Sequence, residues 1–134
     1  MEGAALDAQG SQNKVLIVED SKLVHRMYDL MLTQYTLVHC TDGLDAMQKL
    51  GDHPDADLIL LDLNMPRMSG LEFLKTIKKD PVFSQIPVVI VSTEGKEEDT
   101  NRGLEAGAAG YVTKPFQRED ILEAVQNTMG AQAG

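Results

Sequence analysis

The sequence predicts a three-layer α/β sandwich, in which a parallel five-stranded sheet lies between two layers of helices. Two observations support this fold class. Short apolar segments alternate five times with helix-like segments, and such alternation is typical of parallel sheets with right-handed crossovers. Most of these apolar segments are also hydrophobic throughout, as expected of strands that are covered on both faces. Side chains that follow the strands should therefore meet at one edge of the sheet.

The first half of the chain supplies three expected strands and two expected helices. The segments Lys14–Val18, Thr36–Cys40 and Asp57–Leu61 are the strands. Ser21 is a suitable N-cap for the first helix, and "DGLDAMQKL" (residues 42–50) provides the second. The side chains expected to form the apolar faces of these helices are Leu23, Val24, Met27, Leu30, Met31, Leu44, Met47 and Leu50.

The second half continues the alternation. The third helix should begin at Gly70, and "IPVVIVST" (residues 86–93) should form the fourth strand. The fourth helix (residues 96–108) has few large apolar residues and contains Gly103, which costs about 1 kcal/mol relative to alanine. Gly110–Lys114 is the expected fifth strand. The residues expected to face the core from the third and fifth helices are Leu71, Leu74, Ile77, Ile121, Leu122, Val125 and Met129.

Length and composition indicate one domain. With 134 residues the chain is long enough to bury a sizeable core, and we expect the domain to span residues 14–129. Residues 1–13 are expected to form a disordered tail and residues 130–134 a short C-terminal tail. The lone Cys40 indicates a reducing compartment, and neither a signal peptide nor a membrane span is evident. We therefore expect a cytoplasmic domain.

Charge and histidine spacing exclude some functions. A net charge of -9 argues against direct contact with nucleic acid, because such contact usually requires a basic surface. Proteins or a cation are the more plausible partners. His25, His39 and His53 share no metal-ligand spacing, so no role in a site is expected for them.

Polar side chains follow four of the expected strands. Glu19 and Asp20 follow the first strand, Asp62 the third, Ser92 ends the fourth and Lys114 the fifth. Taken singly, each has an ordinary structural role, but their coincidence at one edge of a sheet favours a site. Three carboxylates at close range repel one another unless a proton or cation intervenes. Mg²⁺ binds oxygen ligands of this kind and keeps waters that a phosphate can displace.

Such a constellation is suited to phosphoryl transfer. A carboxylate such as that of Asp62 can act as a nucleophile and form an aspartyl phosphate. The remaining requirements are in-line positioning and neutralisation of charge on the phosphoryl oxygens. Lys114 would supply a positive charge and Ser92 a hydrogen-bond donor.

Four pieces of sequence, "VLIVEDS", "LILLDLNMPRMSG", "VVIVST" and "GYVTKPF", occur in this order and at these intervals. Together they resemble the receiver domain of bacterial two-component response regulators, of the chemotaxis-type single-domain kind. The resemblance extends from about Lys14 to Met129. It implies a flavodoxin-like (βα)₅ fold with strand order 2-1-3-4-5.

The resemblance also implies roles for the residues at the strand ends. Asp62 would be the phosphoacceptor, and Glu19 with Asp20 would be the acid pair around Mg²⁺ or Mn²⁺. Asn64 would contribute its backbone carbonyl to the metal. Lys114 would contact the phosphoryl group.

Further roles concern switching and hydrolysis. Ser92 and Tyr111 would be the residues that move on activation. Asn64, Thr93 and Glu94 would tune hydrolysis of the phosphoryl group. The residue at position 93 is usually small in receivers, so we hypothesise that the larger Thr93 narrows access and slows hydrolysis.

The expected function is a phosphorylation-activated signalling switch. A sensor histidine kinase or a histidine phosphotransfer protein would donate the phosphoryl group. The domain would then alter its binding of a downstream target protein through the face formed by the fourth helix, fifth strand and fifth helix. It would not be a conventional enzyme, although it would promote its own phosphorylation and dephosphorylation.

Three alternatives remain open. A small Mg²⁺-dependent phosphatase with an aspartyl nucleophile is disfavoured, because Asn64 occupies the position of a second aspartate in such enzymes. A degenerate receiver that serves as a scaffold is disfavoured by the intact set of strand-end residues. The chain could also be a fragment of a larger DNA-binding regulator, although its end soon after the last helix favours a stand-alone domain.

Overall fold

Five parallel strands form the predicted sheet in the computed structural model, which describes residues 13–65, 67–93 and 97–133. The strands are β1 (Lys14–Val18), β2 (Thr36–Cys40), β3 (Leu58–Leu61), β4 (Val88–Thr93) and β5 (Gly110–Lys114). Their order in the sheet is β2-β1-β3-β4-β5. Both the fold class and the strand order are therefore confirmed. Because β1, β3 and β4 are neighbours, their carboxyl ends lie side by side.

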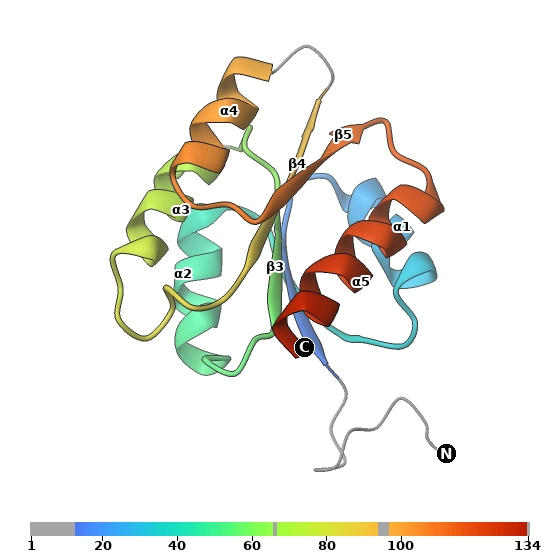
Figure 1. Ribbon diagram of the computed structural model, residues 1–134, viewed down its shortest axis with the longest axis horizontal. Coiled ribbons are helices and arrows are strands. Elements are labelled where there is room, and N and C mark those ends of the chain that lie inside the picture. The colour runs from blue at the N-terminus through green and yellow to red at the C-terminus, as the bar shows by residue number, and fades with distance from the viewer. Residues whose placement is uncertain (1–12, 66, 94–96, 134) are drawn as a thin grey trace.

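Five helices cover the two faces of the sheet. They are α1 (Lys22–Met31), α2 (Gly43–Asp52), α3 (Gly70–Lys78), α4 (Glu97–Glu105) and α5 (Arg118–Ala133). Figure 1 shows α2, α3 and α4 on one face and α1 and α5 on the other. The side chains of Ser21, Asp42 and Ser69 cap α1, α2 and α3 by accepting backbone N–H bonds, each of which stabilises a helix by about 1 kcal/mol. No helix in the described parts of the chain is long and apolar enough to cross a membrane.

The strands alternate their side chains between two apolar cores. Leu16, Val18, Ile59 and Leu61 face α2 and α3 in a cluster that includes Phe73. The intervening residues of β1 and β3 face α1 and α5, in a cluster that includes Tyr28, Phe116, Ile121 and Val125. Both faces of β3, and of β1 after Lys14, are buried, and the residues there are all hydrophobic.

The predicted apolar faces of the first two helices were partly wrong. The side chains of Leu23 and Leu30 are 68% and 76% exposed, whereas Tyr28 is buried and stacks on Phe116 at a centroid distance of 5.6 Å. Neighbouring positions on a helix are about 100° apart, so the orientation that buries Tyr28 turns both leucines outward. Leu44 of α2 is 50% exposed for the same reason, because Ala46 and Leu50 point into the core.

Some element boundaries differ from the prediction. β3 begins at Leu58, one residue later than predicted, and Oδ2 of Asp57 accepts a hydrogen bond from the backbone N–H of Lys14 at 2.8 Å. Helix α4 is shorter than predicted, and Gly107 follows it with a φ of 116°. Helix α5 continues past Met129 through residues 130–133. Residues 1–12 of the predicted N-terminal tail, and Gly134 at the other end, lie outside the described residues.

Candidate functional site

Three carboxylates and one lysine meet at the carboxyl edge of the sheet. Glu19, Asp20 and Asp62 each place an oxygen within 4.8 Å of the others. The Nζ atom of Lys114 lies 2.7 Å from Oε1 of Glu19 and 3.8 Å from Oδ2 of Asp62. Glu19 and Asp62 are buried, whereas Asp20 is exposed. The structure thus brings together four of the residues that the sequence places at strand ends.

Backbone hydrogen bonds hold the two buried carboxylates in place. Glu19 donates its N–H to the carbonyl of Cys40 at 3.0 Å, and its Oε2 accepts from the N–H of Ser21 at 3.0 Å. Asp62 donates its N–H to the carbonyl of Val18 at 2.9 Å, and its Oδ1 accepts from the N–H of Asn64 at 3.2 Å. Glu19 and Asp62 therefore continue β1 and β3, and their backbones are held by hydrogen bonds to neighbouring strands.

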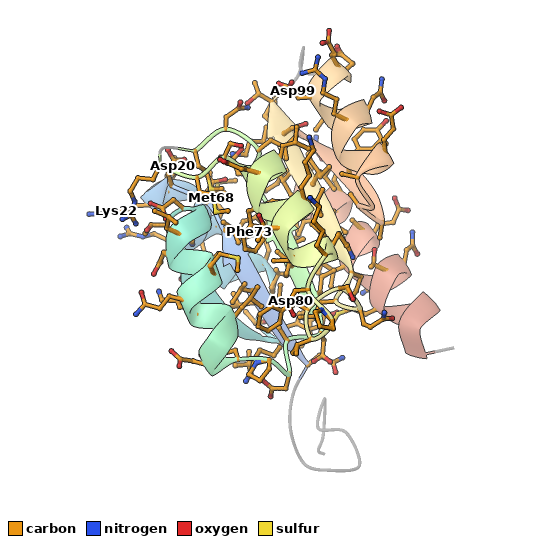
Figure 2. The ribbon with its side chains drawn as sticks, turned by 90° about the vertical axis from the view of Figure 1, so that its left-hand side faces the viewer. Asp20, Lys22, Met68, Phe73, Asp80 and Asp99 are labelled. Carbon is orange, nitrogen blue, oxygen red and sulfur yellow. The ribbon has the colours of Figure 1, made fainter. Side chains whose placement is uncertain are left out.

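Gly70, which lies against the backbone of Asp62, allows the loop after β3 to return to the end of that strand. The N–H of Gly70 donates to the carbonyl of Leu63 at 3.1 Å. A Cβ atom at this position would lie 2.2 Å from the backbone oxygen of Asp62. This close approach explains why α3 begins at a glycine. Figure 2 shows Met68, from the same loop, at the end of the molecule where Asp20 also lies.

The electrostatics of the pocket favour an added positive charge. Burial, followed by the nearby Glu19 charge, raises the pKa of Asp62 from 3.8 to about 6, although the Asn64 N–H and Lys114 oppose this rise. One lysine thus offsets only part of the repulsion among three acids. The donor set consists of carboxylate oxygens with one member, Asp20, open to solvent. Such a set fits a hard divalent ion such as Mg²⁺ or Mn²⁺.

The Ser92 hydroxyl is engaged with helix α4. Ser92 ends the buried part of β4, and its Oγ lies 2.9 Å from Oγ1 of Thr100, which is also buried. Ser92 was predicted from its position at the strand end, whereas Thr100 was not predicted. A lone threonine in a polar helix carries no signal that distinguishes it from a surface residue.

The structure also describes the predicted positions Tyr111 and Thr93. Tyr111 is 55% exposed and lines a groove of about 620 Å³ between β5 and α5. Thr93 is exposed and lines an apolar cavity of about 280 Å³ that Val24 and Phe116 also line. Glu94 lies outside the described residues.

An ion pair that was not predicted from the sequence joins the loop after β3 to the start of α2. Nε of Arg67 lies 2.6 Å from Oδ2 of Asp42, the N-cap of α2. This hydrogen bond holds the pKa of Asp42 below its ordinary value. Arg67 also has a φ of 63°, in the left-handed region that non-glycine residues seldom adopt. The ion pair therefore restrains a loop whose backbone is locally strained.

Comparison with known proteins decides the family. Residues 15–126 match the response regulator receiver domain. The chain belongs to this receiver family. It is 38% identical over 118 residues to the phosphate regulon transcriptional regulatory protein PhoB of Klebsiella pneumoniae, and the match covers 87% of this chain and 51% of that protein. It is 30% identical over 120 residues to the chemotaxis protein CheY1 of Helicobacter pylori, covering 87% of this chain and 97% of that protein.

The solved structures agree. A structure of the chemotaxis protein CheY4 of Vibrio cholerae superposes with a TM-score of 0.80 at 32% identity, covering 87% of this chain and 98% of that one. The receiver resemblance is therefore confirmed, and with it a phosphorylation-activated switch of two-component signalling in preference to a phosphatase. Receiver domains are phosphoacceptors that bind Mg²⁺ at an acidic pocket and interact with phosphodonor and target proteins. The chain spans about half the length of the PhoB relatives that it matches.

Proposed function

We propose that Asp62 is the residue that accepts the phosphoryl group. The observation that carries this assignment is a buried carboxylate at a strand end, with two further acids within 4.8 Å and a lysine 3.8 Å away. Glu19, Asp20 and Asp62, together with the backbone carbonyl of Asn64, would hold Mg²⁺. When bound, the ion would neutralise charge on the carboxylates and on the phosphoryl oxygens.

The residues of the chain position the reaction. A carboxylate oxygen of Asp62 bonds to phosphorus as the P–N bond of the donor's phosphohistidine breaks, and the electron pair of that bond stays on the imidazole nitrogen. The N–H of Asn64 fixes the Asp62 carboxylate. Lys114 already lies between Glu19 and Asp62, so it offsets the charge that the phosphoryl group brings. The domain would in this way promote its own phosphorylation by a histidine kinase or a histidine phosphotransfer protein.

Release of the phosphoryl group would depend on the rim of the pocket. We assign Thr93, Asn64 and Glu94 as residues that tune the attack of water. Thr93 is exposed beside Lys114 in the lining of the same cavity. A Thr93→Ala variant should therefore lose its phosphoryl group faster than the wild type. An unchanged or slower rate of dephosphorylation would reject this role.

The signal would pass from Ser92 to the face formed by α4, β5 and α5. In the structure the Ser92 hydroxyl is bonded to Thr100 of α4. A phosphoryl oxygen on Asp62 would compete for that hydroxyl and so alter the attachment of α4. Tyr111, exposed on the neighbouring β5, would then change position. Binding of a downstream target protein on this face would change as a result.

Addition of beryllofluoride or acetyl phosphate with Mg²⁺ tests the proposal. Amide NMR signals of α4, β5 and α5 should shift in the wild-type protein, and Asp62→Ala should abolish the shifts. Asp52→Asn provides a matched control, because it removes one exposed acid at the end of α2 and should leave the response intact. Identical spectra with and without the reagents would contradict the proposal.

A further inference from the structure

Two histidines and an aspartate outside the phosphoryl pocket form a chain of hydrogen bonds that ends on Glu19. Nε2 of His25, in α1, lies 2.5 Å from the backbone oxygen of Glu19. Nδ1 of His25 lies 2.5 Å from Nδ1 of His39, in β2, and the two rings meet edge to face at 68°. Nε2 of His39 lies 2.8 Å from Oδ1 of Asp29. The chain therefore links the solvent-exposed side of α1 to the backbone of a buried acid.

The direction of each hydrogen bond follows from its end groups. The carbonyl of Glu19 can only accept, so Nε2 of His25 must carry a hydrogen and donate. The ionised carboxylate of Asp29 also only accepts, so Nε2 of His39 donates to it. A hydrogen bond between the two Nδ1 atoms then requires a hydrogen on one of them, which it donates to the lone pair of the other. The bonds at its two ends thus fix the ring orientation of both histidines.

The side chain of His25, in α1, supplies the hydrogen-bond partner of the Glu19 backbone carbonyl. The other polar groups of Glu19 have different partners. Its N–H donates a hydrogen bond to the carbonyl of Cys40, its Oε1 accepts one from Nζ of Lys114, and its Oε2 accepts one from the N–H of Ser21. Glu19 is only 2% exposed, and a buried carbonyl that loses its partner carries the full cost of desolvation. Without His25 the peptide that joins Glu19 to Asp20 would lose the bond that sets its orientation.

We propose that the chain His25–His39–Asp29 is a positioning device for the metal-binding acid pair. By holding the Glu19 carbonyl, His25 fixes the peptide from which the next residue, Asp20, projects. His39 and Asp29 act through His25, because they hold its ring in the donating orientation. This inference rests on the proposed function, since it assigns the chain to the Mg²⁺ site.

The expected size of the effect is a modest loss of metal affinity. Hydrogen-bonding groups behind metal ligands commonly alter affinity by about 10- to 100-fold when removed. His25 acts through the backbone rather than on a ligand atom, so we expect His25→Ala to weaken Mg²⁺ binding by roughly threefold to tenfold. His25→Gln keeps a side-chain N–H donor and should restore affinity to within about twofold of the wild type. His39→Ala should lie between the two.

Mg²⁺ titration of the folded proteins, at one pH and well below the unfolding temperature of each, is the deciding experiment. Calorimetry gives the affinity, and circular dichroism confirms that each variant is folded. His53→Ala serves as a matched control, because the His53 ring contacts Lys14, which lies at the start of β1 rather than at its carboxyl end. A merely structural role for His25 would lower the unfolding temperature and leave the Mg²⁺ affinity of the folded protein unchanged.

A second readout needs no metal. Long-range ¹H–¹⁵N spectra of the metal-free wild type should show hydrogens on Nε2 of both His25 and His39, and His39→Ala should alter the His25 signals. Rapid tautomer exchange at both rings would overturn the inference, as would equal Mg²⁺ affinities in the wild type and in folded His25→Ala and His39→Ala. A wild-type protein that binds no Mg²⁺ would instead remove the proposed site itself.

Discussion

Helices α3 and α4 have nine residues each and cover the same face of the sheet, but they are held there by different means. Helix α3 buries Phe73, Leu74 and Ile77 in the core. The buried residues of α4 are Thr100 and Gly103. A fully buried large apolar side chain contributes about 1.5–3 kcal/mol, so α3 is anchored by several such contributions and α4 by none of them.

This difference matches the positions of the two helices relative to the phosphoryl pocket. Helix α3 follows Asp62 by one short loop, and its first residue, Gly70, packs beneath the Asp62 backbone. Helix α4 follows Ser92 and is joined to it by the hydroxyl bond to Thr100. The strongly packed helix α3 therefore supports the residue that we propose as the phosphoacceptor, whereas the weakly packed helix α4 can change its attachment to the sheet at small energetic cost.

The largest expected effect compares the two helices directly. Phe73→Ala removes a fully buried ring from α3 and should lower the free energy of unfolding by about 3–5 kcal/mol. Leu104→Ala removes a half-buried side chain from α4 and should cost about 1 kcal/mol. Urea unfolding measures both. Equal losses would show that α4 is packed as firmly as α3.

Two glycines sharpen the same comparison. In Gly70→Ala the new methyl group would meet the backbone oxygen of Asp62, so we expect a loss of about 2 kcal/mol and weaker Mg²⁺ binding. In Gly103→Ala the new methyl group would meet only the flexible end of the Ile90 side chain. Alanine also favours the helix by about 1 kcal/mol relative to glycine, which offsets the cost of this contact. Thermal unfolding should therefore separate the two variants. A larger loss for Gly103→Ala would contradict this distinction.

Ionised Asp62, the proposed phosphoacceptor, should destabilise the metal-free protein. The pKa of Asp62 is raised in the folded state from 3.8 to about 6, so the folded protein binds the proton more tightly than the unfolded chain. Stability is then lost as pH rises through this window. Asp62→Asn avoids that loss. The difference in free energy of unfolding between this variant and the wild type should therefore grow in favour of the variant as the pH rises from 3.8 to about 6. Above that pH the difference should stay constant, on the order of 1 kcal/mol.

Thermal unfolding of both proteins across this pH range, without divalent ions, measures the difference. Added Mg²⁺ should stabilise the wild type and leave Asp62→Asn nearly unaffected, because the variant lacks one carboxylate of the site. An advantage for Asp62→Asn that shrinks as pH rises would contradict the assigned direction of the pKa shift.

The smallest expected effect on stability concerns the link between the pocket and α4. Thr100→Val removes the partner of the Ser92 hydroxyl at almost constant volume, which should cost about 1 kcal/mol or less. NMR signals of α4 and Tyr111 in the unphosphorylated variant should move part of the way toward their positions in the beryllofluoride-treated wild type. Signals that stay at the untreated wild-type positions would show that this hydrogen bond does not hold α4 in its unphosphorylated arrangement.

The strand pattern was sufficient to predict the fold class, because β1 and β3 are buried on both faces and contain uninterrupted apolar runs. The meeting of Glu19, Asp20, Asp62 and Lys114 was predicted from their positions at strand ends together with the strand order that the receiver resemblance implied. Helix faces were harder to predict. Leu23 and Leu30 fit an apolar stripe in sequence, but the stacking of Tyr28 on Phe116 set the orientation of α1.

Three other contacts between side chains of separate segments could not be predicted. The Ser92–Thr100 bond, the Arg67–Asp42 ion pair and the bond between His25 and His39 each join two elements of the fold. Such pairs depend on side-chain rotamers and on the positions of whole elements, neither of which has a periodic signal in the sequence.

Chemical trapping of the phosphorylated residue tests most directly whether Asp62, whose backbone lies against the strongly packed helix α3, is the phosphoacceptor. The protein is treated with acetyl phosphate and Mg²⁺, reduced with borohydride to convert an aspartyl phosphate to homoserine, and digested for peptide mass spectrometry. We predict homoserine at position 62 in the wild type and in Asp20→Asn at lower yield, and none in Asp62→Asn. Homoserine at position 20, or undiminished trapping in Asp62→Asn, would contradict the assignment of Asp62.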